Sequence, residues 1–351
     1  MRLQDAAAPI FARHETFHPR YGWFRKAYTT AATTEDGFTD PEAPVKIGVG
    51  KNMVRSIKFW GLAAKILTAD PNSPNKRAVE MIPTSIGHSL FGPAGWDPFM
   101  EDPGTIWLLH WLLLAPPSQV PIWWLAFNEL HAVEFDDEAL GAAVRSHFET
   151  NSDWNTPSDS AMDKDTSIFV RTYSPAVKTN RTSFDDMLDC PFRELGLVTR
   201  SAATGNHRFV LGPKPTLPDE ILAYAILDYV LRREQTGSTI TLAKLANEPG
   251  APGRAFKLTE TDIYTALETV SQTTDGLELL APTGAQQLVW TSDLNDIAVG
   301  ILNRYYDCAP EETVAGPRGD EAVDPDLLPE RSKIMQGLEE ATKRHSTAGA
   351  S

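Results

Sequence analysis

Two clusters of acidic, imidazole and basic side chains contain the residue types that hydrolysis of a phosphodiester needs. The first is the run Arg13-His14-Glu15, with His18 and Arg20 close behind it. A carboxylate next to an imidazole can bind a metal or relay a proton, and an arginine can hold a phosphate. We therefore take His14 and Glu15 as candidate catalytic residues. The alternative is that this run is an exposed polar segment leading into a helix.

The second cluster begins with the adjacent acids Glu101 and Asp102. His110 and the run Asn128-Glu129-Leu130-His131 follow. Neighbouring carboxylates suit a hard divalent ion such as magnesium or manganese, and a histidine can act as a general base. Glu101 and Asp102 are therefore the candidate metal ligands, and they join His110 as candidate catalytic residues. The alternatives are that the two acids cap the helix expected from Gly104, and that His110 is a hydrogen-bonded core residue.

Three other kinds of site are excluded. Residues 48–52, Gly-Val-Gly-Lys-Asn, superficially resemble a phosphate-binding loop, but they lack the four-residue spacer and have Asn52 where Ser or Thr would hold magnesium. The two glycines ahead of a helix still allow the backbone to approach an anion. Cys190 and Cys308 are the only cysteines, so a disulfide framework and a cysteine-based zinc module are excluded. No organic cofactor is expected.

Basic side chains are concentrated at the N-terminal end of an otherwise acidic chain. The 351 residues carry a formal net charge of −15, with 32 Lys and Arg against 47 Asp and Glu. Residues 1–77 hold twelve basic and seven acidic side chains, a net charge of +5, so the other 274 residues carry −20. This asymmetry predicts an anionic partner at one end, and the acidity of the rest argues against coating of nucleic acid by the whole surface.

Residues 51–66, directly after the two glycines, predict an amphipathic helix within the basic part. Apolar residues recur at helical spacing on one side, while Lys51, Arg55 and Lys58 share the other side. Such a helix is typical of the recognition helix of a winged helix-turn-helix domain, although the solvated face of an ordinary helix has the same pattern. The residues expected to contact double-stranded DNA are Arg20, Arg25, Lys26, Lys51, Asn52, Arg55 and Lys58.

The order of predicted elements indicates a mainly α chain of the α+β class, with two or three winged helix-turn-helix-like modules around a tryptophan-rich helical middle. Residues 1–100 form the basic N-terminal module, 101–215 the helical middle with a weaker module of the same kind, and 216–308 a C-terminal module. Residues 309–351, rich in Pro, Gly and acid, are expected to be a disordered tail.

The C-terminal module has the clearest local signals. Leu217 to Arg233 and Thr241 to Asn247 predict a long and a short helix, and Thr259 with the acids after it is typical of the start of another. Leu277 to Ala281 and Gln286 to Trp290 then predict a hairpin across a Pro-Thr-Gly turn. Helix, short helix, helix and hairpin is the winged-helix order.

The middle of the chain is its most apolar part. Its aromatic side chains could stack on splayed bases, but at helical spacing among leucines they are expected to pack in a core. They are Trp107, Trp111, Trp123, Trp124 and Phe127. His110 and several prolines interrupt this part, so it is too broken to span a membrane. With no secretion signal, the expected location is the cytoplasm, in association with the nucleoid.

Several runs resemble one bacterial family found among defence genes. They are His14 to Arg20, Gly22 to Lys26, Gly48 to Ile57, Asp97 to His110, Trp123 to Asn128 and Pro252 to Leu258. In these runs, which span most of the chain, the sequence resembles the SspB family. That family is the DNA-nicking component of Ssp systems, which place phosphorothioates in one strand of host DNA as part of anti-phage defence.

The resemblance implies an endonuclease that nicks one strand so that sulfur can enter the backbone. It also implies partners, namely a cysteine desulfurase, an ATPase and an ATP-pyrophosphatase-like sulfur-transfer protein. It carries no catalytic residue over to this chain, so the candidates stay those chosen from their chemistry, with magnesium or manganese as the expected ion. The alternative is a non-catalytic winged-helix scaffold or regulator of the same machinery. A homodimer is expected only by analogy with winged-helix proteins that read paired half-sites.

Overall fold

Helices dominate the secondary structure, because apolar side chains recur at helical spacing along much of the chain. The computed structural model describes residues 1–74, 78–151, 154–174, 190–233, 237–281 and 284–307, together with residues 340, 343 and 345. About half of the chain is helical, and the sheets are small and antiparallel. The predicted α+β class is therefore confirmed, while the winged-helix modules stay a prediction.

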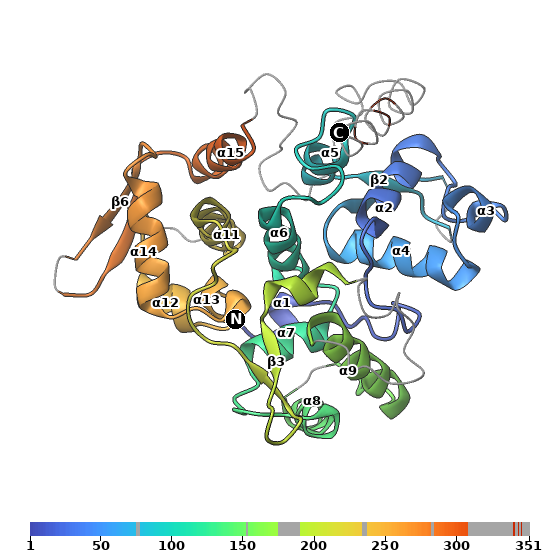
Figure 1. Cartoon of the computed structure of the whole chain (residues 1–351), viewed down its shortest axis with the longest axis horizontal. Coiled ribbons are helices and arrows are strands. Elements are labelled where there is room, and N and C mark those ends of the chain that lie inside the picture. The colour runs from blue at the N-terminus through green and yellow to red at the C-terminus, as the bar shows by residue number, and fades with distance from the viewer. Residues whose placement is uncertain are drawn as a thin grey trace.

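The N-terminal unit forms one lobe of the molecule (Figure 1). Its elements are α2 (Trp23–Thr33), α3 (Ala43–Ile47), α4 (Lys51–Ala63), β1 (Leu67–Ala69), β2 (Met81–Pro83) and α5 (Ser85–Phe91). Helix α2 packs against both α4 and α5. A Cβ built on Gly61 would lie 2.8 Å from the Cβ of Ala27, so glycine allows α4 to approach α2 closely. Helix α2 begins at Trp23, because a strained loop precedes it.

The middle unit contains the helix that is apolar on all sides. Its elements are α6 (Pro103–Leu114), α7 (Pro121–Asn128), α8 (Asp137–Asn151), α9 (Asp159–Tyr173), the 3-10 helix η1 (Pro191–Leu195), β3 (Val198–Arg200) and β4 (His207–Phe209), with the short α1 (Leu3–Ala6) beside α7. Residues 104–114 of α6 are all buried, as expected for a helix with no polar face. The five aromatic residues predicted to pack in the core are at most 1% exposed, which confirms that prediction.

The C-terminal unit packs its helices against a three-stranded sheet. Its elements are α11 (Asp219–Arg232), β5 (Thr239–Thr241), α12 (Leu242–Asn247), α13 (Pro252–Phe256), α14 (Glu260–Ser271), β6 (Leu277–Leu280), β7 (Gln287–Trp290) and α15 (Leu294–Tyr305). The strand order is β5-β7-β6, all antiparallel. The predicted helices and hairpin form with small changes at their ends. Helix α13 was not predicted, because its proline and glycine indicate a loop.

Buried polar contacts join the three units. Lys65, which follows α4, donates from Nζ to the carbonyl oxygens of Leu112 and Ala115 at 2.6 and 2.7 Å. These carbonyls end α6, where a cation is favoured. On the other side of α6, Trp111 and Arg232 donate to Asp228 Oδ2, each at 2.7 Å. One hydrophobic core accordingly runs through all three units, from the first helix to α15.

Two further expectations concern a membrane-spanning helix and the C-terminal tail. None of the helices in the described ranges is long and apolar enough to cross a membrane. The tail predicted at 309–351 lies outside the described residues, apart from residues 340, 343 and 345.

Candidate functional site

The loop before α2 is conformationally strained and carries two of the predicted site residues. Ala12, Glu15 and Thr16 have φ angles of 53°, 50° and 63°, although none is glycine. A side chain disfavours this left-handed region, and such residues persist only where the surrounding structure holds them. They also tend to cluster at functional sites. The loop therefore needs contacts that hold it in this conformation, and helices α9 and α4 supply them.

A buried carboxylate on a distant helix is the main anchor. Asp165 Oδ1, on α9, accepts a hydrogen bond from the backbone N–H of Ala12 at 2.8 Å and another from His14 Nε2 at 2.7 Å. The backbone N–H of Thr16 donates to His14 Nδ1 at 3.1 Å, so Nδ1 is the acceptor and Nε2 carries the proton. The side chains of His14 and Asp165 are 2% and 3% exposed. His14 thus holds the loop and is shielded from any bound polymer.

Helix α4 supplies the other anchors. Ser56 donates from Oγ to the carbonyl oxygen of His14 at 3.0 Å, and Trp60 donates from Nε1 to the carbonyl oxygen of Phe17 at 3.0 Å. The His14 ring also lies nearly parallel to the indole of Trp60, with an interplanar angle of 14°. These contacts fix the loop beside the middle and later turns of α4.

Glu15 is the acidic side chain that this loop presents to solvent near α4. Its Oε1 lies 3.6 Å from Arg55 Nη1, and the two side chains are 32% and 57% exposed. Lys51 and Asn52, in the first turn of α4, are exposed as well. Gly50 provides no side-chain cap, and a Cβ there would meet nothing within 4 Å. The positive end of α4 is therefore open to an anion, with a carboxylate at its side.

Two other predicted DNA contacts, Arg20 and Arg25, lie against aromatic rings. The guanidinium carbon of Arg20 is 5.7 Å from the centre of the Trp23 ring, and that of Arg25 is 4.2 Å from the centre of the Phe99 ring. Both arginines are half-buried, and burial lowers the pKa of Arg25 from its ordinary value. The structure thus separates them from the exposed set on α4.

The two remaining predicted lysines are also turned toward the protein. Lys26 donates from Nζ to the carbonyl oxygen of Ile47 at 2.8 Å. Lys58 Nζ lies 3.5 Å from the carbonyl oxygen of Val79, and burial lowers the pKa of Lys58. Of the seven residues expected to contact DNA, Lys51, Asn52 and Arg55 form the exposed group, which we call the α4 basic face.

The predicted pair of acids has a structural explanation. Asp102 is the N-cap of α6, and its Oδ1 accepts hydrogen bonds from the backbone N–H of Gly104 and from the Tyr305 hydroxyl, each at 2.7 Å. Glu101 is exposed, and its Oε2 lies 3.6 Å from His345 Nδ1. Nothing brings these two acids together with His110, which lies deep in the core.

His110 is fully buried with both ring nitrogens engaged. Its Nδ1 lies 2.8 Å from the Tyr173 hydroxyl, and its Nε2 lies 2.9 Å from the carbonyl oxygen of Ala255. Burial lowers the pKa of His110 to about 4, so the ring is neutral at physiological pH. In this position it joins three segments of the core.

A divalent metal was predicted from the adjacent acids Glu101 and Asp102, so its fit can be tested on the residues. Within the described parts of the chain, no three His, Cys, Asp or Glu side chains come together as a metal-binding group. Asp102 Oδ1 already accepts two hydrogen bonds, and Glu101 faces a histidine. The predicted pair therefore does not fit a metal centre as it stands.

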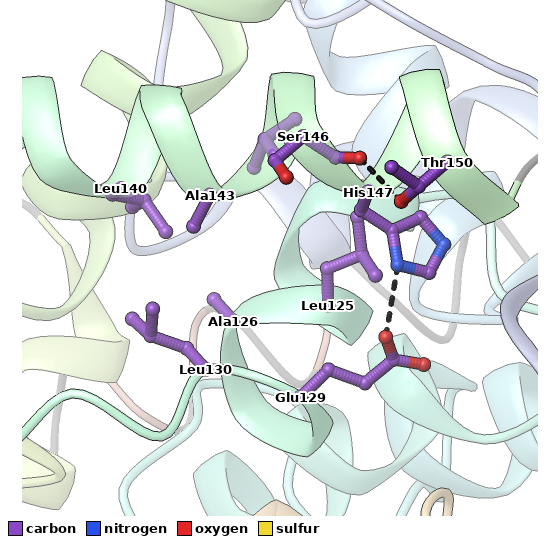
Figure 2. A pocket seen from close by; sticks show the side chains of 10 residues that line it. Leu125, Ala126, Glu129, Leu130, Leu140, Ala143, Ser146, His147 and Thr150 are labelled. Carbon is purple, nitrogen blue, oxygen red and sulfur yellow. Dashed lines mark hydrogen bonds and ion pairs between the residues drawn. The ribbon is translucent and has the colours of Figure 1, made fainter.

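A separate cavity of about 300 Å³ lies between α7 and α8. Its floor is apolar, and at its edge His147 Nδ1 lies 2.9 Å from Glu129 Oε2 (Figure 2). His147 Nε2 is buried and has no hydrogen-bond partner among the described residues. Glu129 belongs to the second cluster of the sequence, but none of the candidate catalytic, metal-binding or DNA-binding residues lines this cavity.

About half of the C-terminal unit offers no positive charge for a phosphate. From Leu258 to Asn303 the sequence contains seven acidic residues and no Lys or Arg. Helix α14 and the β6–β7 hairpin both fall in this stretch. This stretch would repel a polyanion.

The residue that sequence reasoning missed is Asp165. It lies on the buried side of α9, together with Met162, Ile168 and Phe169. An acidic residue at an apolar position of a helix is a sequence signal for a buried polar partner. The pattern does not show that the partner is His14, which is 151 residues away.

The fold and this surface define a mixed α and β protein in which a strained loop presents a carboxylate beside the exposed basic start of a helix. The chain belongs to the family described as protein of unknown function DUF4007, whose model matches residues 11–306.

Similar structures are known. An SspB crystal structure shares 36% sequence identity, with a TM-score of 0.81 over 98% of this chain and 100% of the other. A magnesium ion-bound SspB crystal structure shares 37% identity, with a TM-score of 0.82 over 98% of each chain. The predicted resemblance to SspB is thereby confirmed. No protein of curated function matched the sequence.

Proposed function

We propose that this chain binds duplex DNA at the α4 basic face and nicks one strand, as the SspB-like component of a DNA phosphorothioation system. The observation that carries the proposal is the exposed group Lys51, Asn52 and Arg55 at an uncapped helix start, beside the strained loop that presents Glu15. The similarity to SspB across nearly the whole chain supports it. The acidic C-terminal stretch explains why DNA would meet only one end.

The chemistry assigned to this surface is hydrolysis of one phosphodiester. Arg55 and Lys51 bind the phosphate and stabilise the charge that develops on its oxygens. Glu15 accepts a proton from the attacking water, whose oxygen forms a bond to phosphorus while the bond to the leaving sugar oxygen breaks. The leaving oxygen takes up a proton from solvent water and becomes the free sugar hydroxyl. His14 does not touch the substrate; it positions Glu15 through the loop.

A requirement for a divalent cation belongs to the proposal, because one of the similar structures is a magnesium-bound SspB. Since the predicted acids do not form a metal centre, no step of the reaction is assigned to the ion. The sulfur-transfer proteins named above remain the proposed partners, and the nucleoid the proposed location.

The experiment is nicking of supercoiled plasmid by the full-length protein with magnesium or manganese, and with a chelator as control. Open-circle product should form with the metal and fall sharply in Glu15→Gln. Lys51→Ala/Arg55→Ala should weaken duplex binding and lower the slope of log affinity against log salt by about 2. Arg208→Ala/Lys244→Ala removes the same charge from exposed residues elsewhere. This control should change neither the duplex affinity nor its salt slope. Wild-type nicking by both the Glu15 and α4 variants would rule out this site.

A non-catalytic scaffold or regulator is the second candidate. The described residues contain no metal-binding cluster, which favours it. The C-terminal order is α11, β5, α12, α13, α14, β6, β7, which apart from the short α13 is the order expected of a winged helix, a fold that often only binds. Plasmid that is retarded in a gel yet stays supercoiled with either metal would favour the scaffold over the nickase.

A further inference from the structure

We propose that Phe99 is a stacking site for one unpaired DNA base that bears an exocyclic amino group, and that His345 of the same chain occupies this site when DNA is absent. The inference rests on the proposed DNA binding and adds a second contact to it. It begins from three side chains that come from distant parts of the chain: Arg25 on α2, Phe99 in the loop before α6, and His345.

The Phe99 ring is covered on both faces. The guanidinium carbon of Arg25 lies 4.2 Å from the ring centre. The His345 ring lies 3.9 Å from it at an interplanar angle of 11°. Two groups this close cannot share one face of a ring, so Arg25 lies on one side and His345 on the other. Arg25 thus supports a flat aromatic surface whose opposite face receives a planar heterocycle.

The face that His345 covers has the geometry of a base stack. An imidazole corresponds to the five-membered ring of a purine, and bases stack on aromatic side chains with little regard to sequence. Phe99 is only half-buried, and the side chain of His345 is 42% exposed, so a base could replace the imidazole. The core tryptophans, which are almost fully buried, cannot serve in this way.

A carboxylate at the edge of this site indicates which bases fit. Glu101 Oε2 lies 3.6 Å from His345 Nδ1, and the Glu101 side chain is 71% exposed. A carboxylate accepts a hydrogen bond from the amino group of cytosine, as Glu and Asp do in DNA grooves, and adenine offers an amino group as well. Thymine has none. The geometry therefore favours adenine and cytosine over thymine.

The stacking site belongs to the same lobe as the α4 basic face. Helix α2, which carries Arg25, packs against α4, and Figure 1 shows α2, α4 and α5 together. The next residue, Lys26, binds the carbonyl oxygen of Ile47 just before the turn into α4. A duplex held at α4 could thus extrude a base toward Phe99. Extrusion of a base is known from enzymes that act on the base itself, and it costs a few kcal/mol of lost stacking and pairing, about the size of one aromatic stack.

The test measures binding of short fluorescent single strands of adenine, cytosine or thymine to the full-length protein by anisotropy. Phe99→Ala should weaken binding of the adenine strand by about tenfold, the usual size of one aromatic stack, whereas Phe99→Trp should preserve it. His345→Ala should strengthen binding by about threefold, because it removes the internal competitor. A misfolded variant could not produce that gain.

The role of Glu101 is tested in the His345→Ala background, where the competitor is already gone. There, Glu101→Ala should abolish the preference for adenine and cytosine over thymine. If His345→Ala leaves single-strand affinity unchanged or lowers it, or if Phe99→Ala binds like the wild type, the stacking site is refuted. Failure of the underlying DNA-binding proposal would be seen separately, as duplex affinity that does not respond to Lys51→Ala/Arg55→Ala.

Discussion

Removal of the Asp165 carboxylate should both destabilise the protein and release the strained loop. In Asp165→Ala, the Ala12 N–H and His14 Nε2–H lose the acceptor that each contacts at 2.7 to 2.8 Å. A buried donor left without a partner costs about 1–3 kcal/mol, and in this variant two buried donors lose their partner. We therefore expect the free energy of unfolding to fall by about 4 kcal/mol, which leaves most proteins folded but with a smaller stability margin.

The loss should be visible in urea unfolding followed by tryptophan fluorescence. At a slope of about 3 kcal/mol per M, the midpoint should fall by about 1 M without a change in slope. Asp165→Asn keeps an acceptor oxygen and should lose less than half as much. Because the left-handed residues then relax, nicking by Asp165→Ala should fall at least about tenfold, a change of about 1.4 kcal/mol in the barrier. Duplex affinity, which depends on α4, should change little.

His14→Gln is the matched control for the role of the histidine. Its side-chain amide can still donate to Asp165 from nearly the same place as Nε2, but it cannot act as a base. If His14 only positions the loop, His14→Gln should keep most of the stability and nicking that His14→Ala loses. Wild-type stability and nicking in Asp165→Ala would refute the reasoning. Full stability with no nicking in His14→Gln would show that the imidazole takes part in the chemistry.

Three further predictions concern other buried or capping residues. Asp102→Ala should lower the free energy of unfolding by about 1 kcal/mol. Asp102→Asn, an equally good cap, should keep both stability and nicking. If Asp102→Asn lost nicking but kept its stability, Asp102 would again be a candidate catalytic residue. Because folded His110 has a pKa of about 4 and the unfolded residue about 6.5, the unfolded state takes up the proton first as pH falls. Urea titrations should therefore show up to about 3 kcal/mol of stability lost between pH 6.5 and 4, and a His110→Gln variant with the same loss would disprove this cause. Arg232→Met should lower the free energy of unfolding by about 3–5 kcal/mol, because it leaves Asp228 buried without its cation. The double variant Asp228→Leu/Arg232→Met should regain at least half of that free energy. Losses that simply add in thermal unfolding would contradict a coupled pair.

The sequence by itself determined the features that depend on neighbouring residues. Asp102 followed by Pro103 marks the start of α6, and the two runs predicted to form the C-terminal hairpin do pair, as β6 and β7, because caps and short-range strand pairing are decided within a few residues. The run of tryptophans among leucines correctly indicated the core. The concentration of basic residues before position 78 likewise predicts where an anion would be attracted.

Only the tertiary structure decided what the candidate residues can do. The spacing of Lys51, Arg55 and Lys58 suggested one face, but packing against α4 leaves Lys58 half-buried and the other two exposed. The sequence indicated that His14 could act as a base beside Glu15. In the fold, the Nε2–H of His14 donates to Asp165, which is 151 residues away. A side chain's exposure and partners follow from contacts between distant segments, which depend on how the whole core packs. Local patterns contain no record of those contacts, so the roles became visible only in the fold.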